Sequence, residues 1–201
     1  MERRDALKNL GLSIGGITMS STVVGLLQSC SGKSNLSWNP EIFDSQEAEL
    51  ITKTLEVILP KTEDIPGATE LNLTQFIDGY IKHVSGSEEQ KSIKKLAEKY
   101  LSTTKATLGK KNVSDMTLDD IDSRLAYYLK ADESQIDQWS NEDSDDASNY
   151  NFLNSLRSRG VSAFKMSEYI GEKVLAYSPI PGQQIGCVDL NEATGGKAWS
   201  I

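Results

Sequence analysis

The chain has 201 residues, of which 38% are hydrophobic and 25% charged, and its formal net charge is −8 at pH 7. This length and composition suit one globular domain. Because nucleic-acid binding depends on clustered Lys and Arg, the acidic balance and the lack of a basic patch in the sequence argue against nucleic acid as a partner.

The first thirty residues predict an export signal. Arg3, Arg4 and Lys8 precede a weakly apolar stretch that reaches Leu27 and is too short to cross a bilayer. The paired arginines resemble a twin-arginine leader. The segment Leu-Gln-Ser-Cys30 is similar to a bacterial lipobox. A cytosolic amphipathic helix with a chance cysteine is the alternative.

The leader divides the chain into three segments. We expect a twin-arginine-type lipoprotein signal peptide at 1–29, a lipidated tether at 30–40, and a helical domain with a C-terminal tail at 41–201. Acyl chains on Cys30 would hold the protein on a membrane, since each buried methylene contributes about 0.8 kcal/mol. The expected location is therefore the periplasm or cell envelope, anchored to a membrane.

From residue 44 onward, apolar residues recur at helical spacing and predict an all-α single domain of about five to seven helices. Side chains that can cap a helix start stand before several of these runs. The expected caps are Asp44, Thr74, Ser87, Thr117 and Ser167. Gly109 is expected to end the third helix.

An acidic stretch interrupts the helical pattern at 132–148. It has few apolar residues, so we expect a solvated, mobile insertion. Asp143, Asp145 and Asp146 suggest calcium as an alternative, because carboxylate oxygens close in sequence are calcium ligands. The stretch lacks the spacing of an EF-hand loop, which favours the solvated insertion.

Two segments hold apolar residues that helical periodicity cannot bury. The first is the loop at 61–68, which follows Pro60 and contains the turn signal Pro66-Gly67. The second is the extended Pro/Gly-rich tail at 177–199. Such a tail either folds back on its own domain or lies on a partner, and the sequence leaves both open.

Residues typical of catalysis or cofactor binding are missing from the sequence. It contains no haem, nucleotide, P-loop or nucleophile-elbow motif, and His83 is its only histidine. Caps and turn bonds explain Glu63, Asp64 and Asp78 better than a hydrolytic carboxylate pair does. We therefore expect no catalytic, cofactor-binding or metal-binding residue and no enzyme activity from this chain by itself. Cys187 is interpreted as a small buried residue, with a redox or intermolecular role as the alternative.

The tryptophans offer an alternative function. Trp38, Trp139 and Trp199 could stack against sugar rings, which would make the protein a free-standing envelope lipoprotein that binds carbohydrate or protein. Scattered tryptophans are more typical of a core and its rim.

Three segments of the chain resemble a known family. They are Ile58-Leu-Pro-Lys-Thr-Glu-Asp-Ile-Pro-Gly-Ala68 with the following Phe76-Ile-Asp78, the Arg-Arg leader, and the late Tyr177-x-Pro-x-Pro-Gly-x-x-x-Gly-Cys187. Together they are similar to the gluconate 2-dehydrogenase subunit 3 family. Its members are small partner subunits of membrane-associated flavoprotein sugar and polyol dehydrogenases of the glucose-methanol-choline type.

The resemblance implies a non-catalytic subunit that binds, co-exports and anchors a large flavoprotein. The FAD is expected in that partner and no cofactor in this chain, and a cytochrome c subunit is an optional further partner. Because the loop and the tail coincide with the resemblance, we expect them to form the partner interface. The residues are Pro60, Thr62, Asp64, Pro66, Gly67, Tyr177, Pro181, Gly182, Ile185 and Trp199.

Overall fold

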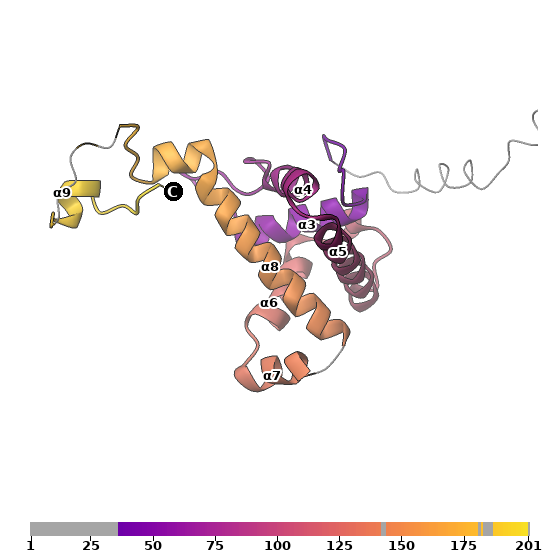
Figure 1. Ribbon diagram of the computed structural model, residues 1–201. Helices are drawn as coiled ribbons and strands as arrows, with labels where there is room; N and C mark the ends of the chain where they lie inside the picture. Colours follow the sequence, from indigo (N-terminus) through magenta and orange to yellow (C-terminus); the bar gives the residue numbers. More distant parts are fainter. Residues whose placement is uncertain (1–35, 142–143, 181, 183–186, 201) are drawn as a thin grey trace, which may run out of the picture. The chain divides into compact units, whose positions relative to one another are not determined.

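The computed structural model of the protein describes residues 36–141, 144–180, 182 and 187–200. Within these ranges the regular structure is helical (Figure 1), which confirms the predicted all-α class. No helix in this part of the chain combines the length and the apolar character needed to cross a membrane. The predicted leader at 1–29 and Cys30 lie outside the described residues.

Short connections join the helices. The α-helices of the described residues, α3 to α9, agree with the expected number of about five to seven. The elements are α3 (Ser45–Ile58), α4 (Leu73–Val84), α5 (Ser87–Leu108), the 3-10 helix η1 (Val113–Asp115), α6 (Leu118–Leu129), α7 (Glu133–Asn141), α8 (Asp145–Met166), the π-helical turn η2 (Ile170–Val174) and α9 (Leu190–Thr194).

Helix α8 is the element on which most of the others pack. It contacts α3, α4, α5, α6 and α7, and η2 continues from its end (Figure 1). The backbones of α3 and α8 approach closely at Gly160. A Cβ there would lie 2.6 Å from Cδ2 of Leu55, a distance that would force Leu55 to move. Glycine at this position therefore permits the close crossing of the two helices.

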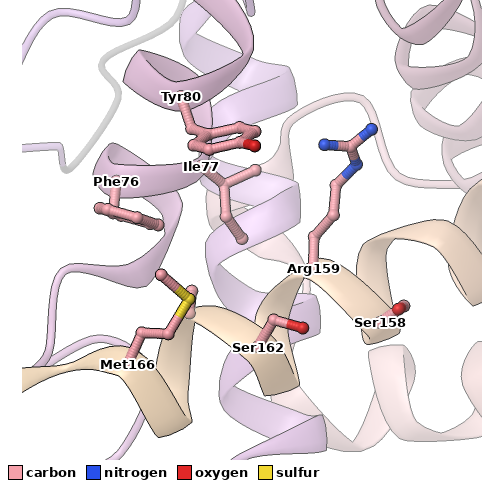
Figure 2. A pocket seen from close by; sticks show the side chains of 8 residues that line it. Phe76, Ile77, Tyr80, Ser158, Arg159, Ser162 and Met166 are labelled. Atoms are coloured by element: carbon pink, nitrogen blue, oxygen red, sulfur yellow. The ribbon is translucent and has the colours of Figure 1, made fainter. Parts of the chain in front are cut away.

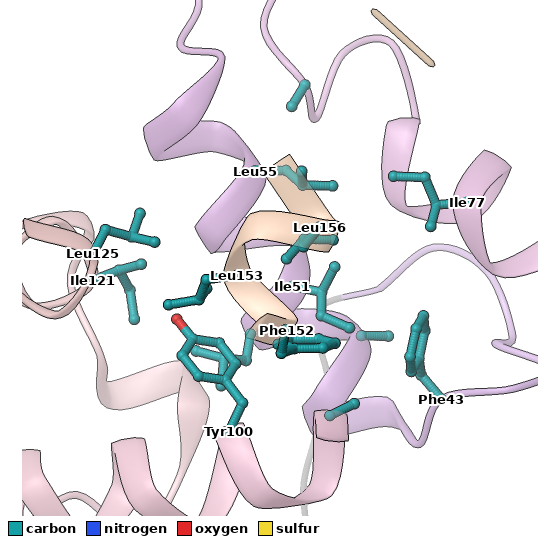
Figure 3. Packing of buried hydrophobic residues seen from close by; sticks show 14 of the residues in the cluster. Phe43, Ile51, Leu55, Ile77, Tyr100, Ile121, Leu125, Phe152, Leu153 and Leu156 are labelled. Carbon is teal, nitrogen blue, oxygen red and sulfur yellow. The ribbon is translucent and has the colours of Figure 1, made fainter. Parts of the chain in front are cut away.

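The hydrophobic core lies between α3, α5, α6 and α8 (Figure 3). Ile51 and Leu55 of α3 are fully buried, and the rings of Tyr100 and Phe152 stand 5.5 Å apart between their centroids. Each such buried side chain contributes about 1.5–3 kcal/mol. The Tyr100 hydroxyl lies 3.1 Å from Oγ1 of Thr54, and burial raises the pKa of Tyr100. The one polar end of this cluster therefore has a partner.

Two of the predicted helix starts are confirmed as capping boxes. Asp44 accepts hydrogen bonds from the backbone amides of Gln46 and Glu47, both at 2.8 Å, and Glu47 accepts the amide of Asp44 at 2.8 Å. Thr117 and Asp120 form the same reciprocal pair at the start of α6. The predicted helix end at Gly109 is also confirmed, with φ at +64°, a conformation that favours glycine.

Two other predicted caps are wrong. Thr74 lies inside α4, where it is buried and its hydroxyl bonds that of Thr52 at 2.9 Å. The chain enters α4 through Asn72, which has a φ of +52° and makes no capping bond with its side chain. Ser87 is the first residue of α5, after Gly86 at the cap position. A tertiary hydrogen bond thus takes the hydroxyl that local sequence assigned to a cap.

The acidic stretch contains a helix that the sequence pattern did not predict. Residues 133–141 form α7, and its Trp139 is only 5% exposed. The indole packs against Tyr127, Tyr128 and Tyr150 with centroid distances of 5.4–5.7 Å. Among the described residues no group of three or more His, Cys, Asp or Glu side chains could hold a metal ion, while Asp143 lies outside them. One aromatic anchor thus folds the acidic stretch onto the domain.

A buried polar network joins α6 to α8 beside that aromatic cluster. Burial raises the pKa of Tyr128 to about 12, so its hydroxyl stays protonated and donates to Oδ1 of Asp146 at 2.8 Å. The same hydroxyl accepts hydrogen bonds from Arg124 at 2.8 Å and from Asn149 at 3.0 Å. These side chains are engaged with one another, which gives Asp146 a structural role.

Candidate partner interface

The loop between α3 and α4 is held by a side chain of α3. Glu56 accepts the backbone amide of Lys61 at 3.3 Å with Oε1 and that of Thr69 at 2.8 Å with Oε2. A Cβ at position 67 would lie 2.7 Å from the Lys61 nitrogen and against Oε1 of Glu56. Gly67 is therefore required here because there is no space for a side chain.

A tight turn presents the predicted residues of this loop. The amide of Thr62 donates to the carbonyl of Ile65 at 2.9 Å, and the amide of Ile65 donates to the Thr62 hydroxyl at 3.1 Å. Pro60, Thr62 and Asp64 are exposed as a result, and Pro66 is half-buried. Of the predicted interface residues in the loop, Thr62, Asp64 and Pro66 thus line one hollow, whereas Gly67 is buried.

This turn forms one wall of a hollow of about 370 Å³. Glu70, Leu71 and Tyr169 complete the walls, and Tyr169 comes from just beyond α8. Lys61 spans the rim, with Nζ 2.5 Å from Oε1 of Glu70, and that hydrogen bond raises the pKa of Lys61. The hollow is therefore lined by apolar side chains together with acidic ones and one paired cation.

A second hollow of about 260 Å³ lies between α4 and α8, and we call it the α4–α8 groove (Figure 2). Phe76 and Tyr80 of α4 face α8, and their rings are 6.2 Å apart between centroids. They are 49% and 45% exposed, and Met166 on the opposite wall is 59% exposed. Side chains of this kind are enriched in the buried parts of protein–protein interfaces.

Sequence reasoning missed this groove. Helical spacing places Ile77, Tyr80, Ile81 and Val84 on one apolar face of α4, but only the two isoleucines are buried. The width of the apolar face of α4 could have indicated the groove. When Phe76 is included, this apolar face is wider than the stripe that a surface helix needs for contact with one core.

The loop hollow and the groove meet near the end of α8. Met166 lines the groove, and Tyr169 lines the loop hollow three residues later. On the α4 side, Leu71 and Phe76 occupy the corresponding positions. The residues that line the two hollows are thus near neighbours in the sequence on both sides, and we call the two hollows together the loop–groove surface.

The tail does not line either hollow in its described part. It returns to the end of η2, where the amide of Ala176 donates to the carbonyl of Ala198 and that of Ser200 to Ala176, both at 2.8 Å. Tyr177 and Trp199 are half-exposed at 50% and 55%. Gly182 is exposed, while Pro181 and Ile185 lie outside the described residues.

Ser167 lies between two helical segments. Its hydroxyl donates to the carbonyl of Phe164 at 2.7 Å, so the side chain bonds the end of α8 and does not cap the next helix. The predicted helix nevertheless starts directly after it, and the Ser167 carbonyl accepts the amide of Gly171 at 2.8 Å. The chain then makes the single π-helical turn η2, in which Ile170 and Gly171 are buried. A hydroxyl beside a helix can bond either end, and sequence alone does not distinguish them.

Asp78, part of the quoted family segment, has a structural role. It is 1% exposed and accepts three backbone amides, from Glu41 at 2.7 Å and from Ile42 and Phe43 at 3.1 Å. This clamp fixes the chain that leads into α3. Hydrogen bonding to the backbone thus explains this acid, as expected.

Two other residues singled out from the sequence do not line either hollow. His83 is exposed, and its Nε2 lies 3.6 Å from Oε1 of Glu41. Cys187 is exposed, so its interpretation as a buried residue is wrong.

The tryptophans do not form a common sugar-binding platform. Trp139 is buried, Trp38 packs half-buried on the core, and only Trp199 presents a largely open ring. An open stacking surface of several tryptophans would require all three rings to be accessible on one face.

The described residues therefore define a class, an α-helical protein with exposed aromatic and Met side chains around a groove between two of its helices. A family model described as gluconate 2-dehydrogenase subunit 3 matches residues 45–182, and the chain belongs to this family. The family is consistent with the role of an accessory subunit in a dehydrogenase complex. The match begins with α3 and includes the loop, the groove and part of the tail. No curated protein and no solved structure matched the chain.

Proposed function

We propose that this chain is the non-catalytic small subunit of a sugar or polyol dehydrogenase complex. In this proposal it binds a large FAD-containing subunit of the glucose-methanol-choline type, and hydride removal occurs on that partner's flavin. The observation that carries the proposal is the loop–groove surface, where segment 58–68 of the family resemblance adjoins exposed aromatic and Met side chains. Membership of the family supports the same role.

The size of the exposed side chains makes this surface a plausible source of binding energy. Phe76, Tyr80 and Met166 each retain about half of their surface in water. Burying a side chain of this size completely is worth roughly 1.5–3 kcal/mol, and the half that remains contributes a corresponding share. Aromatic anchors also lose little conformational freedom on binding, so they are typical hot spots.

The leader supplies the argument for co-export and anchoring. Twin-arginine export moves folded proteins, and the sequence of this chain shows no cofactor motif that would require cytoplasmic folding. A folded partner that lacks its own leader would explain Arg3 and Arg4. Lipid on Cys30 would then hold the complex on a membrane of the cell envelope.

The test is to express the chain together with the flavoprotein subunit that it is proposed to bind and to replace Arg3 and Arg4 by lysine. We expect both proteins to stay in the cytoplasm, because lysine keeps the charge but not the paired-arginine signal. Lys8→Arg is the matched control and should leave export unchanged. Normal amounts of the flavoprotein in the envelope of the double variant would refute the escort role.

A further inference from the structure

The α4–α8 groove is lined by apolar, hydroxyl and cationic side chains. Its α4 wall is apolar apart from the Tyr80 hydroxyl, and its α8 wall carries Ser158, Arg159 and Ser162 (Figure 2). Among the described residues that line the groove, Arg159 is the only one with a formal charge, and no carboxylate is among them. The polar groups of the α8 wall are therefore all able to donate hydrogen bonds.

The sequence of α8 extends this positive charge beyond the lining residues. Lys165 follows Ser158 and Ser162 at spacings of seven and three, which places it on the same side of the helix. From 147 to 167 the chain contains no Asp or Glu. In a protein of net charge −8 this is a local reversal of charge next to exposed apolar side chains.

Arg159 is positioned at the groove edge by a partner on another helix. Its Nη2 donates to Oε1 of Glu89, near the start of α5, at 2.7 Å. The arginine is 28% exposed and the glutamate 48% exposed, so this is a surface ion pair that contributes little to stability. A guanidinium has five N–H donors, so Arg159 can bind a second carboxylate without losing the first.

We propose that the α4–α8 groove receives an acidic amphipathic segment of the flavoprotein subunit. Apolar side chains of that segment pack on Phe76, Tyr80 and Met166, and one of its carboxylates binds Arg159. This inference rests on the proposed function, which supplies the partner, and it adds the chemistry that the partner must present.

Two other occupants fit the charge pattern less well. A symmetric dimer through this face would place Arg159 and Lys165 of each copy close to the same residues of the other, because a twofold interface uses one patch twice. A membrane with anionic lipids would attract the groove but repel a chain whose net charge is −8. An acidic segment of a protein partner satisfies both the apolar and the charged parts of the groove.

The test measures the affinity of the purified full-length chain for the separately purified flavoprotein subunit at low and high salt. We expect Arg159→Gln to weaken binding at least tenfold at low salt and to reduce the dependence on salt. Glu89→Gln should leave binding unchanged or tighten it a few-fold, since it releases Arg159. Arg157→Gln is the matched control, because Arg157 lies two positions before Arg159 and therefore on the opposite side of α8.

Each outcome has a distinct meaning. If the wild-type chain does not bind the flavoprotein, the proposed function is wrong and this inference falls with it. If it binds and Arg159→Gln behaves like Arg157→Gln, the proposed function stands and the acidic segment is refuted.

Phe76→Ser adds two further readouts. If the wild type dimerises and this variant does not, a second copy of the chain occupies the groove. If the wild type binds anionic phosphatidylglycerol vesicles and this variant does not, a membrane occupies it. Either result overturns the inference. Phe76 is half-exposed, so helicity of the variant should be unchanged.

Discussion

The carboxylate of Glu56 occupies the space that a side chain at position 67 would need. From this position it binds two amides of the loop, those of Lys61 and Thr69. The last turns of α3 thereby determine the shape of the loop that follows it. The loop–groove surface therefore depends on a contact between a helix and a glycine that lie eleven residues apart in the sequence (67 − 56 = 11).

Replacing Gly67 by alanine is expected to displace Glu56 and to lower the free energy of unfolding by about 1–3 kcal/mol, since the obstructing atoms include backbone. Urea unfolding measures the change. Gly79→Ala in α4 is the matched control. It meets no atom within 4 Å and should raise stability by about 0.5–1 kcal/mol, because alanine favours a helix interior. A change in the free energy of unfolding that has the same sign for both variants would contradict the close-contact explanation.

Asp78→Asn tests the clamp on the chain before α3. The variant loses the charge and turns an amide donor toward one of the three backbone amides that Asp78 accepts. We expect a loss of about 1–3 kcal/mol in the free energy of unfolding, typical of a buried hydrogen-bonding group left unsatisfied. Asp122→Asn, at an exposed position of α6, should change it by less than about 0.5 kcal/mol. Equal stability of the two variants would exclude the clamp.

Stability at low pH should depend on Asp120. Its hydrogen bond with Lys110, followed by bonds with Thr117, lowers the pKa of Asp120 to about 2 from an ordinary 3.8. The unfolded chain therefore takes up this proton at higher pH than the folded chain. The stabilisation that ionised Asp120 gives the folded chain is therefore fully present above pH 3.8 and is lost as the pH falls toward 2. Asp120→Asn should make the fall in unfolding free energy between pH 4 and 2 shallower, and Lys110→Met should do the same. An unchanged slope in both would refute the assignment.

Tyr177 and Trp199 test the contribution of the tail. Both are half-exposed, so replacing both by aspartate should leave the circular dichroism of the isolated chain unchanged. If the tail contacts the flavoprotein, burying these charges costs several kcal/mol and co-purification is lost. Unfolding of the variant would instead assign the tail to the core of this domain, and normal co-purification would remove it from the interface.

Cys30→Ala tests membrane attachment separately from folding. The variant should appear in the soluble envelope fraction while retaining its helicity, because Cys30 precedes the packed helices by more than a dozen positions. Fractionation followed by mass spectrometry of the N-terminus provides the measurement. A variant that stays with the membrane would show that another feature anchors the chain.

The parts of the fold that sequence predicts correctly are those fixed by neighbours in the chain. The capping boxes at Asp44 and Thr117 need only a residue three positions away, and Gly109 ends its helix through its own backbone freedom. The cap predicted at Thr74 fails because Thr52, on another helix, binds that hydroxyl. Local chemistry decides a helix end only where no tertiary contact competes.

The candidate site was partly predictable for the same reason. Pro60 and Pro66-Gly67 mark the loop as unusual, but the groove beside it forms only when α8 returns against α4. Helix α7 was missed because few residues carry its packing: Trp139 is buried and Ile136 is partly buried against the core, and two positions show no sustained periodicity. The burial of Trp139 against three tyrosines is a property of the fold.

Asp78 binds the segment that leads from the predicted lipid anchor into the domain. From Cys30 to Glu41 there are 11 peptide units (41 − 30 = 11), and a fully extended chain covers at most about 40 Å over that length. Trp38 packs against the core and shortens the free part further. If Cys30 is lipidated as proposed, this short connection would keep a dehydrogenase bound to this chain close to the membrane, and the complex would meet membrane-bound electron acceptors by lateral diffusion in two dimensions instead of three.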